Sequence, residues 1–390
     1  MRATILAFAI ASSGLLCPDC LPQTNPSRSA TERPAAPQTS NTEPGAPAVQ
    51  SLELKETIPL AYPSAGMMGG AKCDGHRNIF VSLPVMNSDG TLRTDVLLEI
   101  LLDSKSTKMF GSQPLPASDY PNQSTDYFDV DADGTVYALV YTRENGKQRD
   151  KQPPVPQYYI ERFNSDGSAD SVVHLDHPPG AGAVGIDPYQ FGIFPDGSFI
   201  LAGIRWDAPT KAEAFTAVYS SSGKFIRSVA LPDDVPGDQT LKAEHASTAQ
   251  RDAASSAVML GSIVSSPDGN VYLLRNSQPV RIYGVDSSGE VVKHFQLSPP
   301  SPGLDVSSTG LVGEDSLFLF FGHPPPQHPG EKPISEWLVG VFNTVSGQFD
   351  GIYALPTKGV GVPACGDQHG GLLFIGHTAD RHLAVVDYGP

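Results

Sequence analysis

Three alternating aspartates form the segment of this sequence that most resembles a metal-binding loop. Asp129, Asp131 and Asp133 alternate with valine and alanine and are followed by glycine, and carboxylates with this spacing can converge on one hard cation such as Ca²⁺. Val140 stands where an EF-hand needs glutamate, and Tyr137 stands where a related calcium loop needs a carboxylate. Because Asp-Gly is also a typical hairpin turn, we expect a turn here, with calcium as the alternative.

Zinc is a second metal hypothesis, based on His76, His369 and His377. No HxH or HExxH spacing supports it, so we expect solvated loop histidines and predict no cofactor. The sequence also contains no nucleophile elbow, no phosphate-cradling glycine loop and no local Ser/His/Asp arrangement.

The charge and composition limit the kinds of partner. The chain has 42 acidic against 26 basic residues, a net charge of −16, and no cluster of Lys and Arg that would neutralise a phosphate backbone. We therefore expect no nucleic-acid partner. The 38 glycines and 36 prolines favour a fold with many tight turns.

The N-terminus has the pattern of a secretory leader. Arg2 precedes a short apolar run that is too short for a membrane anchor. Leu16 before Cys17 is a poor fit to a lipobox, so we expect export to the periplasm or the medium without a lipid anchor at Cys17. We predict a signal peptide over residues 1–20, a disordered Pro/Ser/Thr-rich linker over 21–50 and one globular domain over 51–390, with no transmembrane segment.

The globular part repeats a hairpin with an Asp-Gly turn. Residues 129–141, 191–203 and 263–274 each read as strand, Asp-Gly turn, strand. Weaker copies bring the total to six, with turns at Asp74, Asp133, Asp196, Asp268, Asp315 and Asp367. Second hairpins follow, for example around Asp166-Gly167 and Ser288-Gly289, and two hairpins make a four-stranded unit.

The two chain ends predict how these units close into a ring. The last unit lacks a fourth strand, and the alternating segment from Ser51 to Pro59 reads as that missing strand. The fold class is therefore all-β: a six-bladed β-propeller of four-stranded antiparallel blades, with the N-terminal strand closing the last blade. We expect a monomer.

The segments Pro195-Asp-Gly-Ser-Phe and Pro267-Asp-Gly-Asn-Val-Tyr resemble the repeats of NHL-type and TolB-like six-bladed propellers. The resemblance covers nearly all of residues 52–390. It implies the fold rather than an activity, because members of these families range from protein-binding scaffolds to lyases, lactonases and oxidoreductases.

Basic residues recur where the second strand of a blade ends. These are Arg143, Arg205, Arg275, His323 and His377, in five successive blades, with Trp206 beside the second of them. Such a ring would attract an anionic ligand; pairing with nearby Asp and Glu is the alternative. Asp187, Tyr189 and Gln190, at the start of the third blade's innermost strand, are channel-lining candidates, or they cap and pack that strand.

Cys73 and Cys365 both precede the first turn of their blades, and the ring places the first and last blades side by side. A disulfide across the closure is therefore one prediction, and two separate buried thiols are the alternative.

Two functions fit the sequence. The first is a binding module for a protein, a glycan or a small anionic ligand at the loop-rich face and channel. The second is a lyase, lactonase or hydrolase, with or without a divalent metal.

Overall fold

The computed structural model describes residues 47–63, 70–74, 76–86, 93–110, 122–131, 133–143, 157–179, 185–208, 211–232, 241–242, 262–275, 279–313, 315–323, 336–356, 361–366 and 371–389. The predicted signal peptide and all but the end of the predicted linker lie outside these residues. Within them, the regular structure consists of β-strands, and none of the described segments is a helix long and apolar enough to cross a membrane.

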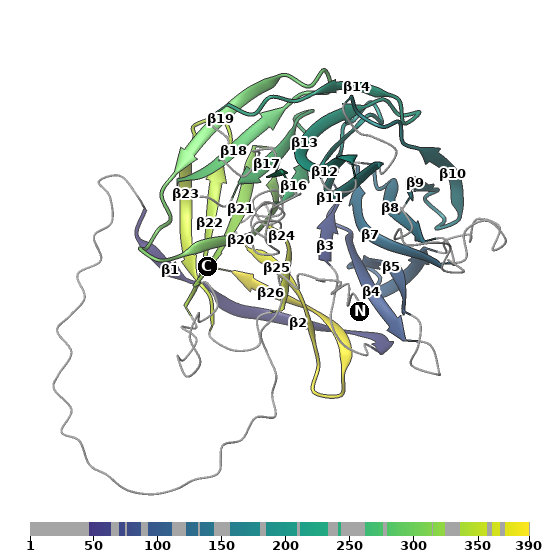
Figure 1. Ribbon diagram of the computed structural model, residues 1–390. Helices are drawn as coiled ribbons and strands as arrows, with labels where there is room; N and C mark the ends of the chain where they lie inside the picture. Colours follow the sequence, from purple (N-terminus) through teal and green to yellow (C-terminus); the bar gives the residue numbers. More distant parts are fainter. Residues whose placement is uncertain are drawn as a thin grey trace, which may run out of the picture.

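The strands form six sheets arranged as blades around a central axis (Figure 1). Blade 1 contains β3 (Gly70–Cys73), β4 (Ile79–Met86), β5 (Arg93–Leu101) and β6 (Ser106–Phe110). Blade 2 contains β7 (Asn122–Val130), β8 (Val136–Arg143), β9 (Gln157–Phe163) and β10 (Ala169–His174). Blade 3 contains β11 (Gly185–Ile193), β12 (Phe199–Ala208), β13 (Lys211–Tyr219) and β14 (Phe225–Ser228). Blade 4 contains β16 (Ile263–Ser265), β17 (Val271–Arg275), β18 (Val280–Val285) and β19 (Val291–Leu297). Blade 5 contains β20 (Asp305–Gly313), β21 (Ser316–Gly322), β22 (Trp337–Asn343) and β23 (Gln348–Ala354). Blade 6 contains β24 (Val362–Gly366), β25 (Leu372–His377), β26 (His382–Gly389) and β2 (Glu53–Pro63).

The predicted all-β, six-bladed propeller is thus the observed fold. Its Asp-Gly hairpins form because glycine adopts a left-handed conformation without steric cost, with φ of +83° at Gly134 and +88° at Gly269. The side chain of Asp131, which comes just before the turn at Gly134, also caps that turn. The Asp131 carboxylate accepts hydrogen bonds from the backbone N–H of Asp133 at 3.0 Å and of Thr135 at 2.8 Å.

The core is divided into six apolar clusters, one at each interface between neighbouring blades. Strand alternation produces this division. In β8, Val136, Ala138 and Val140 pack against blade 1, whereas Tyr137 and Leu139 pack against blade 3. Each blade therefore buries both of its faces against its two neighbours.

The N-terminal strand closes the ring as predicted, because β2 pairs antiparallel with β26 and becomes the outer strand of blade 6. The preceding segment adds a feature that the sequence did not predict. A short strand, β1 (Val49–Ser51), pairs in parallel with β23 at the outer edge of blade 5. Leu52, between the two strands, is buried in the cluster shared by blades 5 and 6. The N-terminal arm, residues 49–63, thus pairs with both blade 5 and blade 6.

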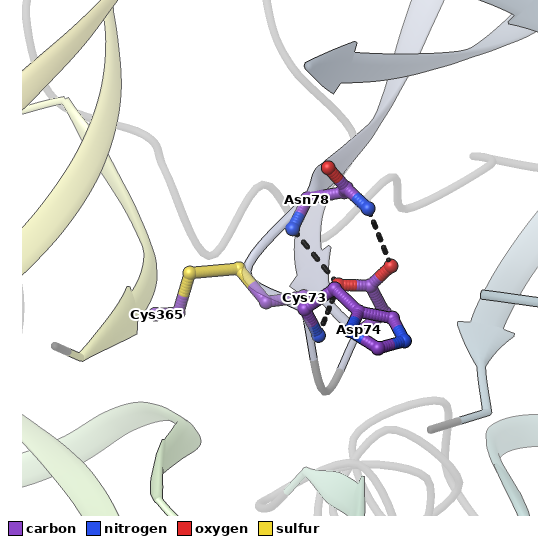
Figure 2. The surroundings of a disulfide bond; sticks show 5 residues. Cys73, Asp74, Asn78 and Cys365 are labelled. Carbon is purple, nitrogen blue, oxygen red and sulfur yellow. Dashed lines mark hydrogen bonds between the residues drawn. A yellow bond between two sulfur atoms is a disulfide. The ribbon is translucent and has the colours of Figure 1, made fainter. Parts of the chain in front are cut away.

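A disulfide joins the innermost strands of blades 1 and 6 (Figure 2). Cys73 ends β3 and Cys365 lies in β24, with their Cα atoms 6.0 Å apart and a sequence separation of 292 residues. The predicted disulfide is confirmed. The adjacent Asp74 carboxylate is held by the backbone N–H of His76 and Asn78 and by the Asn78 side-chain amide, at 2.8–2.9 Å.

Candidate functional site

The central channel is bounded by the innermost strands β3, β7, β11, β16, β20 and β24 (Figure 1). Because each blade is an antiparallel meander, its first and third turns lie at one face of the ring, here called the turn face. The second and fourth strands end, and the first and third strands begin, at the opposite face, here called the loop face. The two ends of the channel therefore differ in what surrounds them.

At the turn-face end, a polar network joins four blades. Asp129 is 2 % exposed, and its Oδ2 accepts a hydrogen bond from the Ser265 hydroxyl at 2.5 Å and from the Ile193 backbone N–H at 3.2 Å. Its Oδ1 lies 3.6 Å from the Lys72 ammonium, which donates to the Ile263 carbonyl at 2.7 Å. Blades 1, 2, 3 and 4 each contribute at least one of these groups.

A narrow cavity lies beside this network. Lys72, Asp129 and Ser265 form its polar lining and Val264, Leu311 and Ala364 part of its apolar lining, and it has room for about one water molecule. The channel is filled by side chains at this level. This end is thus suited to holding blades together rather than to admitting a ligand.

The aspartates of the calcium-like run have separate roles in this structure. Asp129 faces the channel network, Asp131 caps its own turn, and Asp133 is exposed. Burial raises the pKa of Asp131 above its ordinary value, although the backbone N–H groups of Thr135 and Asp133 act in the opposite direction.

The two histidines of the zinc hypothesis that the structure describes lie at opposite faces of the ring. His76 lies in the turn after β3 at the turn face, His377 ends β25 at the loop face, and His369 lies outside the described residues. Across the described part of the chain, no three His, Cys, Asp or Glu residues are grouped as metal ligands would be.

At the loop-face end, Asp187 is the centre of a second polar cluster. It lies near the start of β11, half-buried. Its Oδ1 accepts a hydrogen bond from the Tyr158 hydroxyl of blade 2 at 2.5 Å, and its Oδ2 accepts one from the Tyr189 hydroxyl at 3.0 Å. The β11–β12 register shifts between Pro188 and Gln190, so that Tyr189 is an extra residue in a β-bulge. Bulges of this kind re-aim side chains and are common beside functional sites.

Gln190 and Arg275 form a pair between blades 3 and 4. Nη1 of Arg275 donates to Oε1 of Gln190 at 3.1 Å, and Arg275 is only 2 % exposed. A buried guanidinium has a large desolvation cost unless hydrogen bonds satisfy it. Arg275 is therefore closed off from solvent.

Arg205 and His323 each contact a separate protein group. Nη1 of Arg205 donates to the Pro179 carbonyl at 2.5 Å. Nε2 of His323 lies 3.2 Å from a carboxylate oxygen of Glu336, whereas the His377 side chain is exposed. The side chains of Arg143 and Trp206 lie outside the described residues.

Lys72, Ser265 and Tyr158 were not predicted as site residues. A signal for Lys72 exists in the register of the inner hairpins, which close with the pairs Cys73↔Ile79 and Val130↔Val136. Lys72 and Asp129 precede these pairs, so that aligned repeats place opposite charges at one position of neighbouring blades. No comparable repeat signal identifies Tyr158, because its role depends on how blade 2 packs against blade 3.

No family model matches the sequence, and no curated protein matches it. Solved structures do match. They include the Dos1 propeller, at 10 % identity and a TM-score of 0.41 over 87 % of this chain and 95 % of that chain. A Hadza microbial sialidase, Hz136, matches at 10 % identity and a TM-score of 0.47, over 82 % of this chain and 64 % of that chain. The β-propeller domain of Cps50 (Swd1) from Myceliophteria thermophila matches at 10 % identity and a TM-score of 0.38, over 86 % and 99 %.

The class of the protein is defined by its own blades: it is a six-bladed β-propeller with an N-terminal strand in blade 6.

Proposed function

We propose that the protein is an exported binding module that receives its ligand at the loop face, where β11 begins. The observation that carries this proposal is the Asp187 cluster. A half-buried carboxylate there is oriented by two tyrosine hydroxyls from two blades, beside a β-bulge. The Pro-Asp-Gly hairpins support a place among NHL-repeat or TolB-like propellers.

The other end of the channel supports the same direction of entry. The Lys72–Asp129–Ser265 network and its apolar neighbours leave space for about one water molecule. A ligand larger than water would therefore approach from the loop face, where the long connections lie.

Export is supported by two features. The N-terminal sequence has a leader-like apolar run, and the Cys73–Cys365 disulfide suits an oxidising compartment. Fractionation of cells that express the full-length chain, with mass analysis of the mature N-terminus, tests this part. An intact leader in the cytoplasmic fraction would contradict it.

The binding function is tested by thermal shift and calorimetry with defined probes: citrate, inorganic phosphate, cellotriose and cadaverine. We expect at least one probe to raise the melting temperature, and Tyr158→Phe, which removes one hydroxyl of the Asp187 cluster, to weaken its binding. Ser288→Ala, at an exposed turn of the opposite face, is the matched control. Binding that is lost in Ser288→Ala and kept in Tyr158→Phe would place the site at the wrong face for this proposal.

A further inference from the structure

We propose that the Asp187 cluster binds an alkylammonium group, as carried by a free diamine or by a lysine side chain. This inference rests on the loop-face site proposed above and assigns it a ligand of positive charge. It differs from the anionic ligand that the strand-end basic residues suggested.

Asp187 has no cationic partner among the residues that the structure describes. Its two hydrogen-bond donors, Tyr158 and Tyr189, are neutral phenols. Among the residues that the structure describes, no Lys, Arg or His forms a salt bridge with Asp187. A half-buried carboxylate without a cation has lost hydration that nothing of opposite charge replaces, and a cationic ligand would supply that charge.

The groups around this carboxylate suit an ammonium ligand. Each carboxylate oxygen can accept two hydrogen bonds, and each accepts one from a phenol, so both retain capacity for another donor. An ammonium group carries up to three donors. The rings of Tyr158 and Tyr189 add aromatic surface next to the charge, as in sites that bind alkylammonium groups by cation–π attraction.

The overall charge of the protein also favours a cationic ligand. A net charge of −16 gives the molecule a field that concentrates cations and repels anions. Two guanidinium groups that the structure describes on this side are already engaged, because Arg275 is buried against Gln190 and Arg205 donates to the Pro179 carbonyl.

The test measures the affinity for two ammonium probes by calorimetry: cadaverine, and a lysine whose backbone is capped by an N-terminal acetyl group and a C-terminal amide and whose side-chain ammonium is free. The neutral 1,5-pentanediol is the matched control probe. We expect binding of at least one ammonium probe and none of the diol. Asp187→Asn preserves size and removes the charge, and it should weaken binding by about tenfold or more, as expected for a lost charge-assisted hydrogen bond. Ser288→Ala should leave the affinity unchanged.

The outcomes separate this inference from the proposal on which it rests. If citrate or cellotriose binds and is lost in Tyr158→Phe while neither ammonium probe binds, the site stands and the ammonium assignment is wrong. If ammonium binding is equal in wild type and Asp187→Asn, this inference is overturned. If no probe responds to any change at Tyr158, Asp187 or Tyr189, the loop-face site falls as well. Should Asp187→Asn fail to fold, the Tyr158→Phe/Tyr189→Phe double variant and the diol control make the same distinction.

Discussion

The hydroxyl of Ser265 donates a 2.5 Å hydrogen bond to Asp129, and thereby joins blade 4 to blade 2 at the end of the innermost strand of blade 3. The Ile193 N–H of blade 3 lies 2.7 Å from the same hydroxyl. Lys72 adds blade 1 through its ammonium group. Three polar side chains thus link four of the six blades at one level of the channel, where the apolar interfaces alone would link only neighbours.

We predict that Asp129→Ala destabilises the protein by about 2–3 kcal/mol, because it leaves the Lys72 ammonium without its countercharge and the Ser265 hydroxyl without its acceptor. The magnitude is below that of a fully buried pair, since the Lys72 side chain is 25 % exposed. Urea unfolding measures it. Asp133→Ala, at an exposed position of the same run, should change the free energy of unfolding by less than about 0.5 kcal/mol. Equal effects of the two substitutions would show that the network contributes little.

The disulfide gives a second prediction. The Cys73→Ser/Cys365→Ser double variant should be less stable, because the crosslink closes a loop with a sequence separation of 292 residues. The chain-entropy estimate exceeds about 4.7 kcal/mol for loops longer than 100 residues. The β2–β26 pairing still closes the ring in the variant, so we expect a folded protein with a lower melting temperature. Peptide mapping under non-reducing conditions should recover Cys73 and Cys365 in one crosslinked fragment from wild type, and two free thiols there would contradict the assignment.

A third prediction concerns acid stability and a cluster in blade 4. Burial acts to raise the pKa of Asp268, but hydrogen bonds from Tyr272, Asn270 and Lys293 outweigh it and lower the pKa to about 2. The Tyr272 hydroxyl lies 2.6 Å and the Lys293 ammonium 3.0 Å from Asp268 Oδ2. Because the folded pKa is below the unfolded value, the stabilisation is complete above about pH 4 and is lost as the pH falls toward 2.

Asp268→Asn should therefore lower the free energy of unfolding at pH 7 by about 2 kcal/mol and flatten its dependence on pH between about 4 and 2. Urea unfolding of both proteins at several pH values measures this difference. If wild type and variant lose stability in parallel over that range, Asp268 is not the group responsible.

The sequence was sufficient to predict the blades, because each is built from local hairpins whose turns carry their own glycine and aspartate signals. It also predicted the closing strand, since counting strands left one missing at the end and one spare at the start. β1 was missed because three residues without a turn or an alternating pattern carry no such signal. Its partner is determined only by where the arm runs once β2 is in place.

The site was less predictable, because its contacts cross blades. Asp187 was expected near the channel, but Tyr158, which binds it, is 29 residues away in another blade. The series of strand-end basic residues illustrates the opposite case. Arg275 ends β17 and His323 follows β21, whereas Arg205 lies inside β12, and each of these three side chains contacts a separate protein partner.

A last prediction tests the packing between blades 3 and 4. Gly192 of β11 faces blade 4, and a Cβ atom added there would lie 2.3 Å from Ile263 Cγ2 and 2.8 Å from Val271 Cγ1. Both neighbours are buried β-branched side chains in strands, so they cannot move aside freely. Gly192→Ala should therefore destabilise the protein by about 1–3 kcal/mol.

The control is Gly70→Ala in β3, where an added Cβ would have no heavy atom within 4 Å, and we expect it to be neutral or slightly stabilising. Unfolding free energies in urea distinguish the two, and a neutral Gly192→Ala would mean that the innermost strands are not held together as tightly as this register requires.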